Sequence, residues 1–224
     1  MKIHPLITDS GTLAALVERL ATHDFVAVDT EFMRESTYWP ELCLIQIASV
    51  DEAAAIDPMA DGIDLKPLWD LLVDNEDVLK VFHAGGQDLE IVHNVTGKTP
   101  QPLFDTQIAA MALGLGEQIG YTNLVAAYAN IQVDKGARFT DWARRPLNDR
   151  QIEIGALGID GGGFVRAGDL HQAQIGVIGA LAHELGINRD EISGSPAGAK
   201  LFESRGVRHQ RMNQHGARYS NLAA

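Results

Sequence analysis

The chain has 224 residues, of which 46% are hydrophobic, and this suits one globular domain with a full core and room for an appendage. A formal net charge of −12 argues against broad electrostatic binding of nucleic acid, but not against a nuclease whose carboxylates hold metal ions against phosphate. The single cysteine, Cys43, excludes an intrachain disulfide and fits a reducing compartment. With neither a signal-peptide pattern nor an apolar run of about 18 residues, we expect a cytoplasmic protein without a membrane span.

The spacing of apolar residues predicts an early hairpin-rich group of strands followed by alternating helices and strands. In chain order we expect a helix capped by Asp9 or Ser10, strands over residues 25–28, 42–48 and 53–56, a helix over 65–72, a strand over 78–82, helices over 87–95, from Asp105 to 113 and over 122–131, and a last helix opening at Asp149. The first two strands are expected to pair as a hairpin. This order predicts an α/β fold with a mixed sheet.

The first predicted strand ends in two acids. Asp29 and Glu31 follow the apolar residues 25–28, with Thr30 between them. Alternate side chains of a strand face the same side, so both carboxylates point one way. Such a pair is costly unless a cation lies between the acids, and hard divalent cations prefer oxygen ligands. In the competing interpretation Asp29 begins a turn and Glu31 is solvated.

Asp88 is a third candidate acid. It follows the predicted strand over 78–82 and a Gly85-Gly86 turn, and it lies in the first turn of a helix. Strand-to-helix junctions of an α/β sheet collect at one edge, so Asp29, Glu31 and Asp88 can converge there. The alternative is that Asp88 only complements the helix dipole.

Four long segments occur in order and together resemble one known family. They read VDTEFMRESTYWPELCLIQIA, VFHAGGQDLEIV, PLFDTQIAAMALGLGEQIGYTNLV and KGARFTDWARRPLNDRQIE. Over residues 1–153 the chain is similar to the bacterial ribonuclease D family of DEDD 3′–5′ exonucleases. The resemblance implies a ribonuclease-H-like mixed sheet flanked by helices and two divalent metal ions, Mg²⁺ or Mn²⁺. It also implies release of single nucleotides from RNA 3′ ends, usually of tRNA precursors.

By position, the resemblance makes Asp29, Glu31 and Asp88 the catalytic metal ligands. The family's third motif, Tyr-x-x-x-Asp, is altered here. Ile154 stands in place of the Tyr and Gly158 in place of the Asp. If one residue is inserted, Asp160 becomes a substitute metal ligand.

The composition changes near residue 154, since 13 of the 22 glycines follow it. We therefore expect an exonuclease domain over residues 1–160. A divergent Gly-rich segment over 161–224 would contain a helix that ends near Leu185 and a poorly ordered tail over 204–224. A change of coding frame in the gene is one hypothesis for this shift, and the nucleotide sequence tests it.

Several other residues are candidates for binding substrate. Phe32, Arg34 and Tyr38 flank the acids, where a base could stack and a phosphate could pair, and His83 ends the strand before Asp88. The alternatives are a core position for Phe32, a surface position for Arg34 and a structural hydrogen bond for His83.

A basic and aromatic segment over 138–146 contains Arg138, Trp142, Arg144 and Arg145. It is either an RNA-binding patch or a solvated loop. Two other functions also stay open, a non-catalytic RNA-binding remnant and a DNA 3′–5′ exonuclease of the same superfamily.

Overall fold

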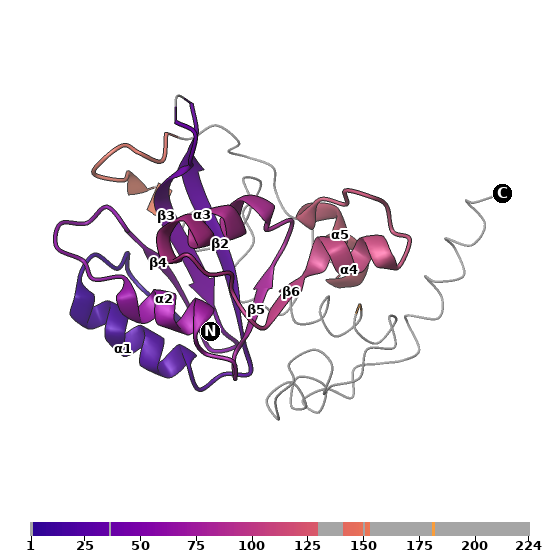
Figure 1. Cartoon of the computed structure of the whole chain (residues 1–224), viewed down its shortest axis with the longest axis horizontal. Helices are drawn as coiled ribbons and strands as arrows, with labels where there is room; N and C mark the ends of the chain where they lie inside the picture. The colour runs from indigo at the N-terminus through magenta and orange to yellow at the C-terminus, as the bar shows by residue number, and fades with distance from the viewer. Residues whose placement is uncertain (1, 36, 130–140, 150, 153–180, 182–224) are drawn as a thin grey trace.

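A computed structural model describes residues 2–35, 37–129, 141–149, 151–152 and 181 (Figure 1). Within them three consecutive strands follow the first helix, and helices and strands then alternate as far as the last two helices. In order these are β1 (Lys2–Ile3), α1 (Ser10–Leu20), β2 (Phe25–Met33), β3 (Glu41–Ala48), β4 (Glu52–Ile56), α2 (Lys66–Val73), β5 (Leu79–Phe82), α3 (Gly86–Thr96), β6 (Leu103–Asp105), α4 (Thr106–Ala112) and α5 (Tyr121–Ala129).

The strands form one mixed sheet in the order β1-β4-β3-β2-β5-β6. β3 is antiparallel to both β2 and β4, whereas β1 pairs with β4, β5 with β2 and β6 with β5 in parallel. The predicted hairpin and the predicted α/β fold with a mixed sheet are confirmed. β1 is absent from the predicted elements because a strand of two residues shows no recognisable period.

Helices α1, α2 and α3 lie together on one face of the sheet (Figure 1). Apolar side chains from this face and from the helices form the main core, which includes Leu13, Leu16, Val26, Val28, Ile45, Ile47, Leu68, Leu72 and Val92. Of the two predicted caps of α1, Asp9 is the N-cap, and its carboxylate accepts a hydrogen bond from the Thr12 N–H at 2.8 Å. This N-cap satisfies one of the unpaired N–H groups of the first turn.

Residues 141–149 and 151–152 pack on the opposite face. Trp142 and Leu147 are buried there against Leu44 and its neighbours. Arg145 donates to both carboxylate oxygens of the buried Asp57, at 2.8 and 2.7 Å. The interpretation of Trp142 and Arg145 as an RNA-binding patch is therefore wrong, because one is buried and the other is bonded to an acid 88 residues away. Arg144 is exposed, and Arg138 lies outside the described residues.

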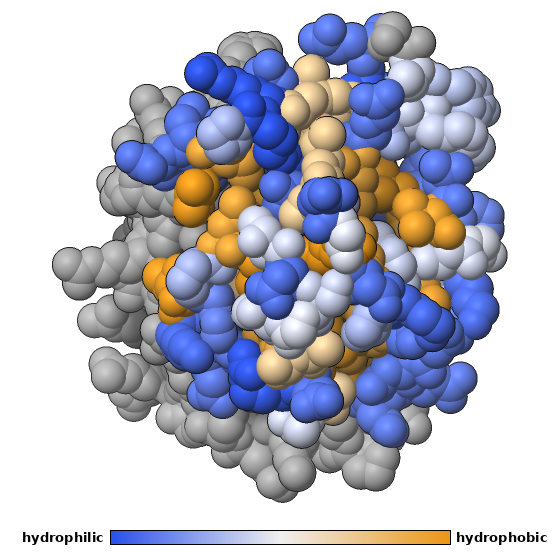
Figure 2. Space-filling view, turned by 90° about the vertical axis from the view of Figure 1, so that its left-hand side faces the viewer, coloured by the Kyte–Doolittle hydropathy of each residue, from blue (hydrophilic) through white to orange (hydrophobic). Residues whose placement is uncertain are grey.

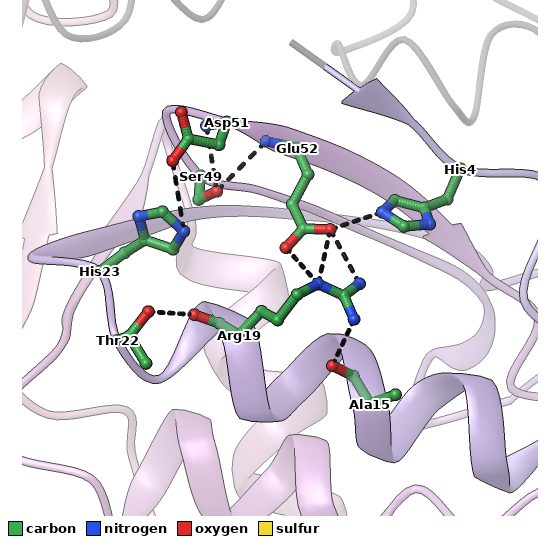
Figure 3. Close-up of polar contacts among 8 residues, drawn as sticks. All are labelled: His4, Ala15, Arg19, Thr22, His23, Ser49, Asp51 and Glu52. Atoms are coloured by element: carbon green, nitrogen blue, oxygen red, sulfur yellow. Dashed lines mark hydrogen bonds and ion pairs between the residues drawn. The ribbon is translucent and has the colours of Figure 1, made fainter.

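A charged cluster around the buried Glu52 joins the N-terminal residues to the sheet (Figure 3). Glu52, at the start of β4, accepts hydrogen bonds from Arg19 Nε and Nη2, both at 2.8 Å, and lies 2.5 Å from His4 Nε2. The Arg19 guanidinium and, to a lesser degree, His4 hold the pKa of Glu52 below its usual value, although burial opposes them. The cluster ties α1, β4 and the residue after β1 to one another.

Hydrophilic side chains cover most of one side of the molecule, with apolar ones between them (Figure 2). In the part of the chain that the structure describes, no helix is both long and apolar enough to cross a membrane. The expected boundary at residue 160 and the tail over 204–224 lie outside the described residues. Of the predicted helix that ends near Leu185, Leu181 is described, and it is helical and buried against Ala109, Ala110 and Leu124.

Candidate active site

β2 carries Asp29 and Glu31 in the middle of the sheet, and both are half-buried. The β2–β3 register pairs Asp29 with Gln46 and Glu31 with Leu44. Directly paired residues share a face of the sheet, so both carboxylates belong to the face against which Trp142 and Leu147 pack. The register shifts after Glu31, as at a β-bulge, a feature that re-aims side chains next to active sites.

Asp88 lies in the first turn of α3 and is buried. Its Oδ1 accepts a hydrogen bond from Thr30 Oγ1 at 2.5 Å, and Thr30 is the residue between the two strand acids. Burial raises the pKa of Asp88, whereas the hydrogen bond from Thr30 favours the charged form and opposes this shift. The fold thus brings Asp88 to the Asp-Thr-Glu segment from 58 residues away.

The turn before α3 is built for close packing. A Cβ added to Gly85 would lie 2.7 Å from the Cβ of Phe82, so a larger residue does not fit there. Asp105 accepts hydrogen bonds from the N–H groups of Ala84, at 3.1 Å, and Gly85, at 2.9 Å. It also caps α4 through the Gln107 N–H at 2.8 Å. The predicted cap is confirmed, and the same carboxylate also holds the turn that begins the helix of Asp88.

The carboxylates of the three acids do not yet form one group. Alternate residues of a strand face opposite sides, so Thr30, which contacts Asp88, points away from Asp29 and Glu31. Within the described residues, no three His, Cys, Asp or Glu side chains gather in a group that could hold a metal ion. Three carboxylates are suitable donors for a hard divalent cation. For one cation to be held by all three acids, the Asp88 carboxylate must give up its hydrogen bond to Thr30 and bind the cation instead. Asp160 lies outside the described residues.

His83, directly after β5, contacts Tyr121, at the start of α5. Their rings meet edge-on, with centroids 5.3 Å apart, and Tyr121 is buried. Burial raises the pKa of Tyr121, and the negative charge of Asp29 raises it further. His83 Nδ1 lies 2.9 Å from Thr106 Oγ1. The same hydroxyl lies 3.2 Å from the Phe82 carbonyl oxygen, so Thr106 links His83 to the end of β5.

The predicted substrate-binding residues after the acids lie in the β2–β3 hairpin. Tyr38 is 78% exposed, and its ring meets that of Trp39 edge-on with centroids 5.0 Å apart. Arg34 forms an ion pair with Glu90 of α3, with an Nη1–Oε2 distance of 2.9 Å, and donates to the Tyr38 carbonyl at 3.0 Å. Phe32 is half-buried. Arg34 therefore fixes the end of the hairpin to α3.

Sequence reasoning did not single out Thr30, which bonds to Asp88, Gln46, which pairs with Asp29, or Tyr121, which contacts His83. Gln46 carried a usable signal, because it is a polar residue within the apolar run of β3. Thr30 and Tyr121 carried none, since their importance depends on contacts with residues distant in the chain.

Comparisons with known proteins agree with this arrangement. Residues 5–156 match the family model described as 3′–5′ exonuclease. Ribonuclease D of Sphingobium indicum is 74% identical over 153 residues, which are 68% of this chain and 39% of that protein. The chain therefore spans about two fifths of the length of this curated relative.

Two solved structures share the fold. The crystal structure of Escherichia coli RNase D, an exoribonuclease involved in structured RNA processing, is 33% identical with a TM-score of 0.71, over 91% of this chain and 51% of that chain. Brucella melitensis NrnC with bound Mg²⁺ is 22% identical with a TM-score of 0.59, over 85% of this chain and 92% of that chain. The match over residues 5–156 covers more than half of the chain, which therefore belongs to the 3′–5′ exonuclease family as a homologue of ribonuclease D.

Proposed function

We propose that this chain is a 3′–5′ exoribonuclease that removes single nucleotides from RNA 3′ ends, with tRNA precursors as its substrate class. The observation that carries the proposal is the Thr30–Asp88 hydrogen bond, which brings the third acid to the strand that bears Asp29 and Glu31. The 74% identity to a ribonuclease D and the RNA-processing role of the E. coli structure support RNA as the substrate.

Asp29, Glu31 and Asp88 would hold two Mg²⁺ or Mn²⁺ ions, with Asp160 as a further ligand. When bound, such ions lower the pKa of an attacking water and neutralise charge on the phosphate. The Thr30 hydroxyl keeps the buried Asp88 closer to its charged form, which is the form that binds a cation. The Mg²⁺ bound to Brucella NrnC supports this choice of metal.

Phe32, Arg34, Tyr38 and His83 would contact the RNA strand. The exposed ring of Tyr38 is available for stacking on a base, a contact that depends little on sequence. Arg34 would act mainly by holding the hairpin, because its guanidinium is paired with Glu90.

A second candidate is an RNA-binding protein without catalysis. Two observations favour it. Ile154 stands where the family has a Tyr, and the described residues contain no three-acid group able to hold a metal ion.

Incubation of the 224-residue protein with 5′-labelled single-stranded RNA and DNA, in Mg²⁺ or Mn²⁺, separates these functions. We expect a ladder of labelled RNA strands, each shorter than the last by one nucleotide. Asp29→Asn should abolish it, whereas Asp61→Asn, the same change at an exposed loop position, should not. Binding of RNA without cleavage in either metal supports the second candidate, and equal shortening of DNA removes the preference for RNA. Full activity of Asp29→Asn would place the site elsewhere.

A further inference from the structure

The side-chain amide of Gln46 is buried in the centre of the sheet. The residue is 3% exposed, and neither Nε2 nor Oε1 has a hydrogen-bond partner among the described residues. A buried amide in this state destabilises the fold, and a leucine could occupy the same apolar strand without that penalty. The amide therefore calls for an explanation other than packing.

The position of Gln46 connects it to the candidate site. It pairs with Asp29 on β2 and with Ala55 on β4, so these three residues form a row across one face of the sheet. Directly paired residues have Cβ atoms about 4.5–5.5 Å apart. A glutamine side chain can span this distance, so the amide lies within reach of the Asp29 carboxylate and of what that carboxylate binds.

A second buried glutamine shows how a structural amide behaves in this protein. Gln151 is also 3% exposed. Its Oε1 accepts from the Asn148 N–H at 2.9 Å, and its Nε2 donates to the Asp141 carbonyl at 2.8 Å. Gln151 thus holds its own segment together, whereas Gln46 makes no comparable bond within the described residues.

We propose that Gln46 is a positioning residue for the divalent cation of the active site. Its Oε1 accepts a hydrogen bond from a water on the cation, and its Nε2 donates to the Asp29 carboxylate. This inference rests on the proposed function, because it requires a cation at Asp29. A hydrated cation supplies the partners that the amide otherwise lacks, and bonds of this kind orient the groups that hold a metal.

The test compares Gln46→Met with Gln151→Met in the full chain, by melting in EDTA and by calorimetric titration with Mn²⁺. Methionine has nearly the length of glutamine but no amide. Gln46→Met should keep or raise the metal-free Tm and weaken Mn²⁺ binding about tenfold. Gln151→Met should lower the metal-free Tm and leave the Mn²⁺ affinity of the folded protein unchanged.

Three results would overturn the inference. Wild-type affinity for Mn²⁺ in Gln46→Met removes it while the proposed function stands. A fall in metal-free Tm as large as that of Gln151→Met makes Gln46 a structural residue. Failure of the wild type to bind Mn²⁺ removes both the inference and the proposed metal site.

A second variant gives a readout of opposite sign. Gln46→Glu places a second carboxylate opposite Asp29, so the metal-free Tm should fall and the rise in Tm on adding Mn²⁺ should exceed that of the wild type. A rise equal to that of the wild type counts against Gln46 facing the cation.

Discussion

The hydroxyl of Thr30 donates a hydrogen bond to the carboxylate of Asp88 across 2.5 Å, and so joins β2 to the first turn of α3. Thr30, which lies between Asp29 and Glu31 on β2, therefore holds the third candidate acid, Asp88, in place. Hydrogen bonds to charged acceptors are about twice as strong as neutral ones. Because Asp88 is buried, its position in the absence of metal depends on this bond.

Replacement of Thr30 by Val should therefore destabilise the fold. The change leaves a buried carboxylate without its donor, and we expect the free energy of unfolding in urea to fall by about 1.5–3 kcal/mol. Thr99→Val is the same change at an exposed position, and its free energy of unfolding should stay within about 0.5 kcal/mol of the wild-type value. Equal effects of the two changes would mean that Thr30 does not support Asp88.

Gly85→Ala should disturb the start of α3. The added methyl would lie 2.7 Å from the Phe82 Cβ, and we expect a loss of about 1–3 kcal/mol in unfolding free energy together with reduced nuclease activity, because Asp88 moves with the helix. Gly86→Ala is the matched control, since an added Cβ there meets nothing within 4 Å. Its unfolding free energy should change by less than about 1 kcal/mol. Similar losses in the two variants would contradict the close approach at Gly85.

The buried Glu52 should make stability depend on pH. Its folded pKa is below the usual 4.5, so its bonds to Arg19 and His4 stabilise the fold above that value and are lost as the pH falls through the folded pKa. At pH 7, Glu52→Gln should lower the unfolding free energy by about 1–2 kcal/mol. The difference from the wild type should shrink steadily below about pH 5.

Asp51→Asn is the control for this series. Asp51 is 78% exposed and its contact with His23 spans 3.9 Å, so its loss should have little effect at any pH. A difference between wild type and Glu52→Gln that stays constant between neutral and acid pH would show that the carboxylate charge contributes nothing.

Arg145 and Arg144 should behave differently although they are neighbours. Arg145→Met leaves the carboxylate of Asp57 buried and unpaired, and we expect a loss of about 3 kcal/mol in unfolding free energy. Arg144→Met changes an exposed side chain and should leave the unfolding free energy and the Tm close to the wild-type values. Comparable Tm values for the two variants would restore Arg145 as a candidate for RNA contact.

Features with local signals could be predicted from sequence. The helix caps Asp9 and Asp105 were predicted, because capping depends on residues two or three positions away. The β2–β3 hairpin was also correct, since each strand is an apolar run of adequate length.

Features that depend on distant partners could not be predicted. A basic and aromatic segment looks the same whether it faces RNA or packs on the sheet, and the partner of Arg145 lies 88 residues earlier. The contact between Asp88 and Thr30 depends on where β5 ends relative to β2, and spacing within either segment does not reveal it.

The central claim is that Asp29, Glu31 and Asp88 together hold divalent cations. A crystal of the full chain soaked in Mn²⁺ tests it through anomalous difference density. We predict a peak about 2.0–2.6 Å from carboxylate oxygens of both Asp29 and Asp88, with Asp88 released from Thr30. Two results would contradict the account. One is density only elsewhere in the molecule. The other is no density at all after a soak in saturating Mn²⁺, with Asp88 still bonded to Thr30.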